Sequence, residues 1–294
     1  MTTGIAWWPA WLIMAVAHAL AGPLPWLPLG RIQAAHCNIQ VAYPELGFLK
    51  RQWLLYRCLV HWLATALEIL QAGAPSWHGR CLKKRMSLEG LDHLDRARKE
   101  GRGVILLGAH AGNFPWFVLR LAVEGYPVSV LYKEQRTLPA HFFRGILERF
   151  GIEGLAVQEG RHQATRRALR ALRNGRVLFI HMDQGRRHGE MVRFMGKMVR
   201  LPAGPAVLAA ASRSPCLPAC TWRTRLGHTA RIHPPLELIQ KPSRTGLQAN
   251  LQTMAQVLEQ MIREHPTQWL WMHRLFKWGV DHSYCENTSL REIP

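Results

Sequence analysis

Charged residues are missing from the start of this 294-residue chain, because Thr3–Leu29 contains no Asp, Glu, Lys or Arg. The sequence also lacks a glycine-rich P-loop, a GxSxG elbow and an HExxH pair, so these common catalytic motifs are excluded. Its six cysteines form no close repeating pairs, and His228 and His233 bracket a predicted strand without further ligands. No metal site is therefore predicted, and we expect the cysteines to be reduced and structural.

Acidic residues are scarce throughout, since 19 Asp and Glu stand against 38 Lys and Arg and leave a formal net charge of +19. Such an excess favours a polyanionic partner, for which nucleic acid, anionic lipid headgroups and an acidic carrier protein all qualify. The 12 tryptophans favour a membrane interface, where amphipathic rings lie at headgroup level. A nucleic-acid partner is not predicted, because the basic residues are scattered and no recognition module is present.

The uncharged N-terminal stretch predicts a hydrophobic anchor helix. Prolines at positions 9, 23, 25 and 28 limit this helix to about Ala10–Leu20, which spans only about half of a bilayer core. We therefore predict a membrane anchor or interfacial segment over residues 1–30. A cleaved signal peptide and a buried hydrophobic helix are the alternatives. Basic residues follow this segment and none precedes it, so the positive-inside bias predicts that the body is cytoplasmic.

Three further regions are predicted after the anchor. Residues 31–84 are expected to form a helical subdomain and linker, because Phe48–Leu70 repeats apolar residues at helical spacing and Gln71–Lys84 combines glycine, proline and cations. Residues 85–280 are expected to form an α/β domain, and residues 281–294 a C-terminal tail.

The predicted α/β domain alternates strands with helices. Its expected strands are Val104–Leu107, Val128–Tyr132, Arg176–Ile180, Leu217–Trp222 and Thr229–His233. One expected helix begins near Pro115, and the others are Phe142–Phe150, Arg161–Arg173, Pro202–Ser212, Leu247–Arg263 and Trp269–His273. Alternation of elements of these lengths predicts an α/β fold with a mixed, largely parallel sheet covered by helices on both faces.

The segment Gly103–Trp116, GVILLGAHAGNFPW, contains the strongest candidate for a catalytic residue. Its apolar run predicts a fully buried strand, after which His110 lies on a loop in front of a helix. Open α/β sheets place their chemistry at the carboxyl ends of their strands. A histidine that merely caps a loop is the alternative, but this position favours a functional one.

The same segment resembles the histidine motif of the late acyltransferases of lipid A biosynthesis (the lauroyl/myristoyl acyltransferase family), His-Phe-Gly-Asn-Trp-Glu. Three further blocks of that family are matched in order, over Leu88–Gly103, Arg176–Pro205 and Pro266–Lys277. The resemblance implies a glycerolipid acyltransferase-like fold and a membrane-associated O-acyltransferase. Such an enzyme moves a fatty acyl chain from acyl carrier protein or coenzyme A to a hydroxyl of a lipid A precursor or a related glycolipid.

The resemblance also implies that the acyl thioester is the only co-substrate, without a further cofactor. It implies a location at the cytoplasmic face of the bacterial inner membrane, with acyl carrier protein or coenzyme A thioester and the anionic lipid surface as partners. The basic surface of the chain suits both an acidic carrier protein and an anionic lipid.

One departure from the family pattern concerns the acid that pairs with the histidine, because its position is occupied here by Pro115. His110 remains the expected general base, since imidazole suits proton transfer at neutral pH. Asp183 is the preferred replacement for the acid, because it follows another strand and matches an acidic position of the second block. Glu134 and a histidine without a partner are alternatives. A structural pairing of Asp183 with the nearby Arg186 or Arg187 is equally consistent with the sequence.

Six further residues are predicted to bind substrate. Gly112 and Asn113 could polarise the thioester carbonyl, although both are also ordinary loop-forming residues. Lys133 and Arg136 follow the second strand and could bind a donor or acceptor phosphate. Gln184 in the second block and Arg274 in the C-terminal block complete the set.

A protein without catalytic activity is the alternative function. Such a family member would bind lipid or acyl carrier protein, and the loss of the paired acid at Pro115 is the reason to consider it. An acidic side chain within hydrogen-bonding distance of His110 would favour the enzyme instead.

Overall fold

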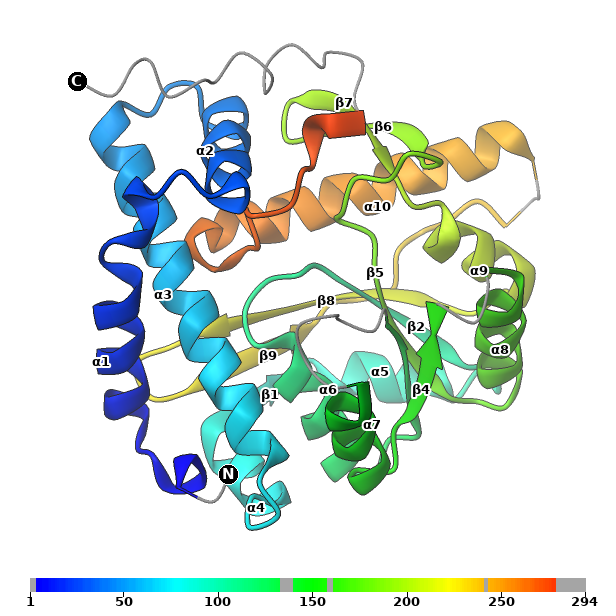
Figure 1. The fold of residues 1–294 in the computed structure, drawn as a ribbon. Helices are drawn as coiled ribbons and strands as arrows, with labels where there is room; N and C mark the ends of the chain where they lie inside the picture. The colour runs from blue at the N-terminus through cyan, green and yellow to red at the C-terminus, as the bar shows by residue number, and fades with distance from the viewer. Residues whose placement is uncertain (1–3, 133–139, 158–160, 241–242, 279–294) are drawn as a thin grey trace.

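The computed structural model describes residues 4–132, 140–157, 161–240 and 243–278, which build a seven-stranded sheet with helices on both faces (Figure 1). In pairing order the strands are β1 (Met86–Glu89), β9 (His228–Ile232), β8 (Cys216–Arg223), β2 (Val104–Gly108), β5 (Val177–His181), β3 (Val128–Tyr132) and β4 (Glu153–Ala156). Neighbouring strands are parallel except β8 and β9, which are antiparallel. The predicted mixed, largely parallel sheet is confirmed.

The helices lie before, between and after these strands. They are α1 (Ala10–Ala21), α2 (Gly30–Ala42), α3 (Phe48–Gly73), α4 (Gly79–Arg85), α5 (Leu91–Arg98), α6 (Phe114–Val123), α7 (Ala140–Arg149), α8 (Arg161–Arg173), α9 (Gly204–Ser212) and α10 (Arg244–Glu264). Short 3₁₀ turns cover Ile5–Trp7, Leu24–Trp26, Pro266–Gln268 and Phe276–Trp278. A separate hairpin pairs β6 (Glu190–Phe194) with β7 (Lys197–Leu201) and packs against α10.

The central strand β2 shows why both faces of the sheet need helices. All five of its residues are buried. Ile105 and Leu107 belong to the apolar cluster that includes residues of α3, α8, α9 and α10. Val104 and Leu106 alternate with them and join the cluster of α4, α5 and α6. A continuous apolar run, rather than an alternating one, follows from burial on both faces.

The N-terminal helices share a core with the α/β body. Ile13 and Ala17 of α1 are buried in the same cluster as Leu258 of α10. The predicted helix at residues 10–20 is confirmed, and Figure 1 shows it lying beside α3. By length and apolar composition α3 could cross a membrane, but half of that window is buried inside the protein. The helical segments Ala10–Trp26 and Gly30–Ala42 reach the length and apolar composition of a membrane span only when they are counted together. The chain bends by 81° between them.

Several sequence predictions need correction. The predicted linker at residues 71–84 is mostly helical, since α3 continues to Gly73 and α4 begins at Gly79. Short or weakly patterned elements were not predicted, namely α2, β1, β4 and the β6–β7 hairpin. Cys58, Cys81, Cys216 and Cys220 are free, but Cys37 is disulfide-bonded, so the expectation of reduced cysteines is wrong there. The predicted tail at residues 281–294 lies outside the described residues.

A buried carboxylate joins α3 to three other elements. Glu68 accepts hydrogen bonds from Asn113 Nδ2 at 2.7 Å, Arg223 Nη2 at 2.8 Å and His228 Nε2 at 3.1 Å. Burial raises the pKa of Glu68, but the charges of His228 and Arg223 outweigh it, and the net shift of this pKa is downward. These bonds connect α3 to the start of α6, the end of β8 and the start of β9.

We expect Glu68→Gln to destabilise the fold by about 3 kcal/mol, because it leaves the charge of Arg223 buried without its counter-ion. Urea unfolding followed by tryptophan fluorescence measures this loss. The control is Glu89→Gln, which breaks the Glu89–Arg231 pair, where both side chains are nearly half exposed. That variant should lose no more than about 1 kcal/mol. Equal losses in the two variants would contradict a special role for the buried carboxylate.

Candidate active site

The site forms where β2 and β5 end. These strands are parallel neighbours whose register pairs Gly108 with His181. His110 and Asp183 each follow two residues later, so both leave the same edge of the sheet at the same height. Parallel strands place their carboxyl ends together, which is why residues 73 positions apart can meet here.

Asp183 holds His110 through two hydrogen bonds. Its Oδ1 lies 2.7 Å from His110 Nδ1, and its Oδ2 accepts from the His110 backbone N–H, also at 2.7 Å. The indole Nε1–H of Trp269 donates to Oδ2 at 2.7 Å. Asp183 is 1% exposed, whereas the His110 side chain keeps 20% of its surface exposed. The partners of Asp183 are therefore His110 and Trp269 rather than Arg186 or Arg187.

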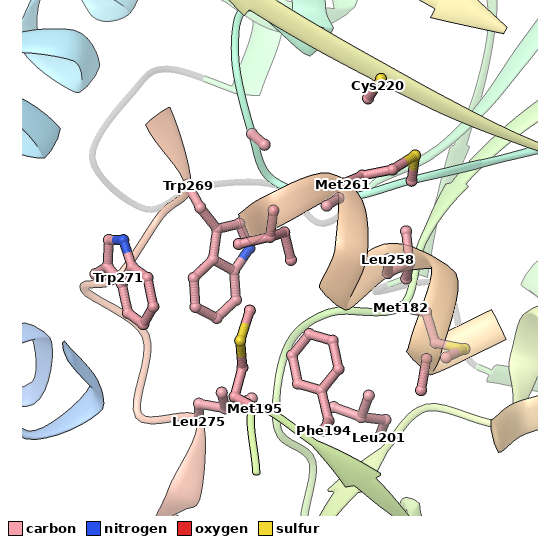
Figure 2. Packing of buried hydrophobic residues seen from close by; sticks show 14 of the residues in the cluster. Met182, Phe194, Met195, Leu201, Cys220, Leu258, Met261, Trp269, Trp271 and Leu275 are labelled. Carbon is pink, nitrogen blue, oxygen red and sulfur yellow. The ribbon is translucent and has the colours of Figure 1, made fainter. Parts of the chain in front are cut away.

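The surroundings of Asp183 keep it ionised. Burial acts to raise the pKa of its carboxyl, but the charge of His110 and the hydrogen bonds from His110 and Trp269 outweigh burial and lower it. Trp269 is fixed by packing, since its ring lies edge-on to Trp271 at 4.6 Å and against Phe194 (Figure 2). A carboxylate held by three donors orients the imidazole and opposes its rotation.

The helix predicted at residues 269–273 is wrong, because Trp269 has extended backbone and the residues after Leu270 form a turn. The segment that carries Trp269 forms a β-bridge with the histidine loop, where Leu270 N–H donates to His110 O at 2.9 Å and Gly112 N–H donates to Gln268 O at 3.0 Å. Asn38 of α2 donates to Trp271 O at 2.6 Å. These backbone groups have partners outside their own segment, so no helix is needed to satisfy them.

Gln184 and His273 lie on the open side of His110. Gln184 Nε2 lies 2.9 Å from His110 Nε2 and 2.7 Å from His273 Nε2. Because an amide nitrogen only donates, both ring nitrogens accept, and the proton of neutral His110 is on Nδ1, facing Asp183. His110 thus presents an unprotonated Nε2 toward the open side. Burial lowers the pKa of His273 to about 4, with further lowering by the charge of His110.

Aromatic rings form the remaining wall of the site. His181 stacks on His110 with ring centroids 4.0 Å apart, and Phe114 meets His110 edge-on at 5.4 Å. Burial lowers the pKa of His181 well below its ordinary value, so this ring is neutral at pH 7. Its Nε2 is shielded from solvent and has no hydrogen-bond partner among the described residues.

The loop residues Gly112 and Asn113 have structural partners instead of facing the open side of His110. Asn113 is fully buried, where its Oδ1 accepts from Trp116 N–H and caps α6, while its Nδ2 donates to Glu68. Gly112 has a φ of 59°, and a Cβ there would lie 2.0 Å from Thr221 O. Only glycine fits this close approach. The predicted substrate-binding roles of these two residues have no support in this arrangement.

The other predicted residues have mixed outcomes. Lys133, Glu134 and Arg136 lie outside the described residues. Arg274 lines a pocket of about 550 Å³ together with Gln184 and His273. No group of three or more His, Cys, Asp or Glu side chains within the described ranges could hold a metal ion.

Trp269, His181, His273 and Glu68 were not predicted as site residues. The first three lie in the blocks that match the family, but nothing in their spacing indicates a contact with His110. Glu68 carries a weak signal, since it is an acid on a largely apolar helix.

Comparison with known proteins adds independent information. Residues 2–278 match the family model described as bacterial lipid A biosynthesis acyltransferase. A phosphatidylinositol mannoside acyltransferase of Mycobacterium tuberculosis is 28% identical over 227 residues, covering 74% of this chain and 68% of the relative. The lipid A biosynthesis palmitoleoyltransferase of Escherichia coli is 23% identical over 254 residues, covering 84% and 79%.

Among solved structures, the 1-acyl-sn-glycerophosphate acyltransferase of Thermotoga maritima aligns with 80% of this chain and 97% of its own. The TM-score is 0.39 and the sequence identity is 15%.

The burial of His273 leads to a measurable prediction. In NMR spectra of histidine-labelled protein, this ring should titrate near pH 4, because burial and nearby positive charges disfavour its protonation. His273→Asn identifies the resonance. Arg186→Gln should raise this pKa, since the charge of Arg186 contributes to lowering it. A resonance that titrates near pH 6.5 and does not respond to Arg186→Gln would contradict the proposed environment.

Proposed function

Since the chain belongs to the bacterial lipid A biosynthesis acyltransferase family, we propose that it transfers a fatty acyl chain from a thioester of acyl carrier protein or coenzyme A to a hydroxyl of a lipid A precursor or related glycolipid. Relatives are named as acyltransferases of lipid A and of phosphatidylinositol mannoside, so the chain is an acyltransferase of this type. The observation that carries the proposal is the contact between His110 and Asp183.

In the proposed reaction His110 is the general base. Its Nε2 takes the proton of the acceptor hydroxyl while the oxygen attacks the thioester carbonyl. The C–O bond of the new ester forms, the C–S bond breaks, and the proton passes from Nε2 to the departing thiolate. Asp183 does not change its protonation; it holds the ring and stabilises the imidazolium that forms. These steps require no cofactor beyond the acyl thioester.

Gln184 is the residue that the acceptor must displace. Its amide donates a hydrogen bond to the lone pair on His110 Nε2, and this lone pair must accept the proton of the acceptor hydroxyl. A bound hydroxyl can donate to Nε2 in its place, so the exchange preserves one hydrogen bond. We therefore assign Gln184 to the acceptor side of the site.

The alternative of a non-catalytic binding protein loses its main support. It rested on Pro115, which cannot pair with His110. The required carboxylate comes instead from the neighbouring strand, at 2.7 Å from the ring. The named acyltransferase relatives also favour the enzyme.

We also propose that the protein works at the cytoplasmic face of the bacterial inner membrane. Large apolar side chains are exposed on the N-terminal segment and at the start of α3, including Trp7, Trp11, Trp26, Leu49 and Trp53. Tryptophan is favoured at membrane interfaces, and the net charge of +19 favours anionic lipid. Because α1 packs along α3, the arrangement favours a protein surface that inserts shallowly into the membrane interface over a separate anchor helix.

The decisive test is transfer of labelled acyl chain from acyl carrier protein or coenzyme A to extracted bacterial glycolipid. His110→Ala should abolish transfer. Asp183→Asn should lower kcat by ~10⁴, as expected when a catalytic histidine loses its carboxylate. The control is Asp92→Asn, which removes an exposed carboxylate that pairs with Arg96 and should leave kcat unchanged.

Thermal melting establishes that each variant is folded. Transfer by folded His110→Ala at the wild-type rate would refute the role of His110. No transfer by the folded wild type from any donor would favour the binding protein.

A further inference from the structure

The pocket of about 550 Å³ beside the catalytic histidine has an unusual lining. Arg31, Arg186, Arg274 and Lys277 contribute its charged side chains, and no acidic residue lines it. They come from α2, from the loop after β5 and from the C-terminal segment, so the fold brings them together from distant parts of the chain. All four residues are exposed.

The three arginines of this pocket carry their charge at the protein surface. In the part of the chain that the structure describes, no carboxylate pairs with Arg31, Arg186 or Arg274. Another surface pocket, lined by Arg80 and Lys83 among others, differs in this respect, because Lys83 Nζ lies 3.0 Å from Glu124. Of these two pockets, the one near His110 therefore gathers three arginines that have no carboxylate partner among the described residues.

The N-terminus of α2 adds further positive potential. Gly30 and Arg31 begin this 13-residue helix, and its N-cap residue Leu29 provides no side-chain hydrogen bond. The Nη2 of Arg274 lies 3.7 Å from the position that a Cβ would take on Gly30. A guanidinium is thus held against a helix terminus of the same sign, which an anion would stabilise.

The pocket connects directly to the catalytic base. Gln184 and His273 belong to its lining, and Gln184 is hydrogen-bonded to His110 Nε2 at 2.9 Å. An anion in this pocket would lie about one side chain away from the reacting hydroxyl. Arg31 Nη1 donates a hydrogen bond to the backbone oxygen of Met272 at 3.3 Å, beside His273, and Arg186 lines the same pocket as His273.

Exposed apolar residues directly precede Gly30, which lines the pocket, in the chain. Trp26, Leu27 and Leu29 are exposed immediately before Gly30. A lipid with its chains against these residues can direct a headgroup anion to the α2 terminus, whereas a free soluble anion would not use them.

We propose that this pocket binds a phosphate group on the headgroup of the lipid acceptor and thereby directs the acceptor hydroxyl to His110. Arginine forks and helix N-terminal amides both suit phosphate oxygens. The inference rests on the proposed acyl transfer for its purpose, but the binding itself can be measured without any transfer.

The test is calorimetric titration with dihexanoyl phosphatidic acid, a soluble phosphate-bearing lipid, below its aggregation concentration. Wild-type protein should bind it, and should not bind dihexanoylglycerol, which lacks the phosphate. Arg31→Ala and Arg274→Ala should each weaken binding about tenfold, as expected for the loss of a charge-assisted hydrogen bond. The matched control is Arg80→Ala, which removes an exposed cation from the other pocket and should change nothing.

Two further titrations separate the sources of phosphate. Inorganic phosphate should bind more weakly than the lipid, because it lacks the contact with Trp26, Leu27 and Leu29. Phosphopantetheine represents the acyl donor, and its binding should not depend on Arg274. If Arg274→Ala weakens phosphopantetheine but not the lipid, the pocket serves the donor and the proposal is overturned. Equal lipid binding by Arg274→Ala, Arg80→Ala and wild type overturns it as well.

Kinetics distinguish this proposal from the proposed function. In acyl transfer, Arg274→Ala should raise KM for a phosphate-bearing acceptor about tenfold and leave KM for the donor unchanged. Active wild type with an unchanged acceptor KM in Arg274→Ala would refute the pocket assignment alone. Phosphate-dependent lipid binding without any transfer would refute the proposed function alone.

Discussion

The carboxylate of Asp183 is the interaction on which the site depends. It accepts hydrogen bonds from the ring and the backbone of His110 and from the indole of Trp269. Burying an anion is costly unless donors satisfy it, and here three donors do so. The same contacts join the ends of β2 and β5 to the C-terminal segment. Loss of this carboxylate would therefore release the catalytic ring and one wall of the site together.

The position of the acid illustrates how a parallel sheet can replace one residue by another. In the resembled motif the acid follows the histidine after four intervening positions, where this chain has Pro115. Proline is tolerated there because it lies in the first turn of α6, which Asn113 caps. The register of β2 with β5 brings a different carboxylate to the same edge of the sheet. The chemistry requires a carboxylate at Nδ1, whichever strand supplies it.

The N-terminal helices are part of the catalytic architecture rather than an appendage. Glu68 of α3 holds Asn113 in the histidine loop, and Asn38 of α2 holds the segment that carries Trp269. The same helix α2 supplies Arg31 to the basic pocket. The proposed membrane surface, the proposed phosphate pocket and His110 are thus connected through these helices. This arrangement suits a substrate whose acyl chains, phosphate and hydroxyl occupy different environments.

The sequence by itself determined five of the seven strands of the sheet, most helices and the position of His110, because apolar periodicity and turn residues act locally. It made Asp183 the preferred replacement for the missing acid, but the contact with His110 depends on β2 and β5 being neighbours, which the sequence does not specify. Only the tertiary structure decided the non-helical path of Trp269–His273, which forms backbone hydrogen bonds with the histidine loop and accepts one from Asn38 of α2. It likewise decided the roles of Asn113 and Glu68 and the meeting of Arg31 with Arg274. These are contacts between residues far apart in the chain, and no local pattern encodes them.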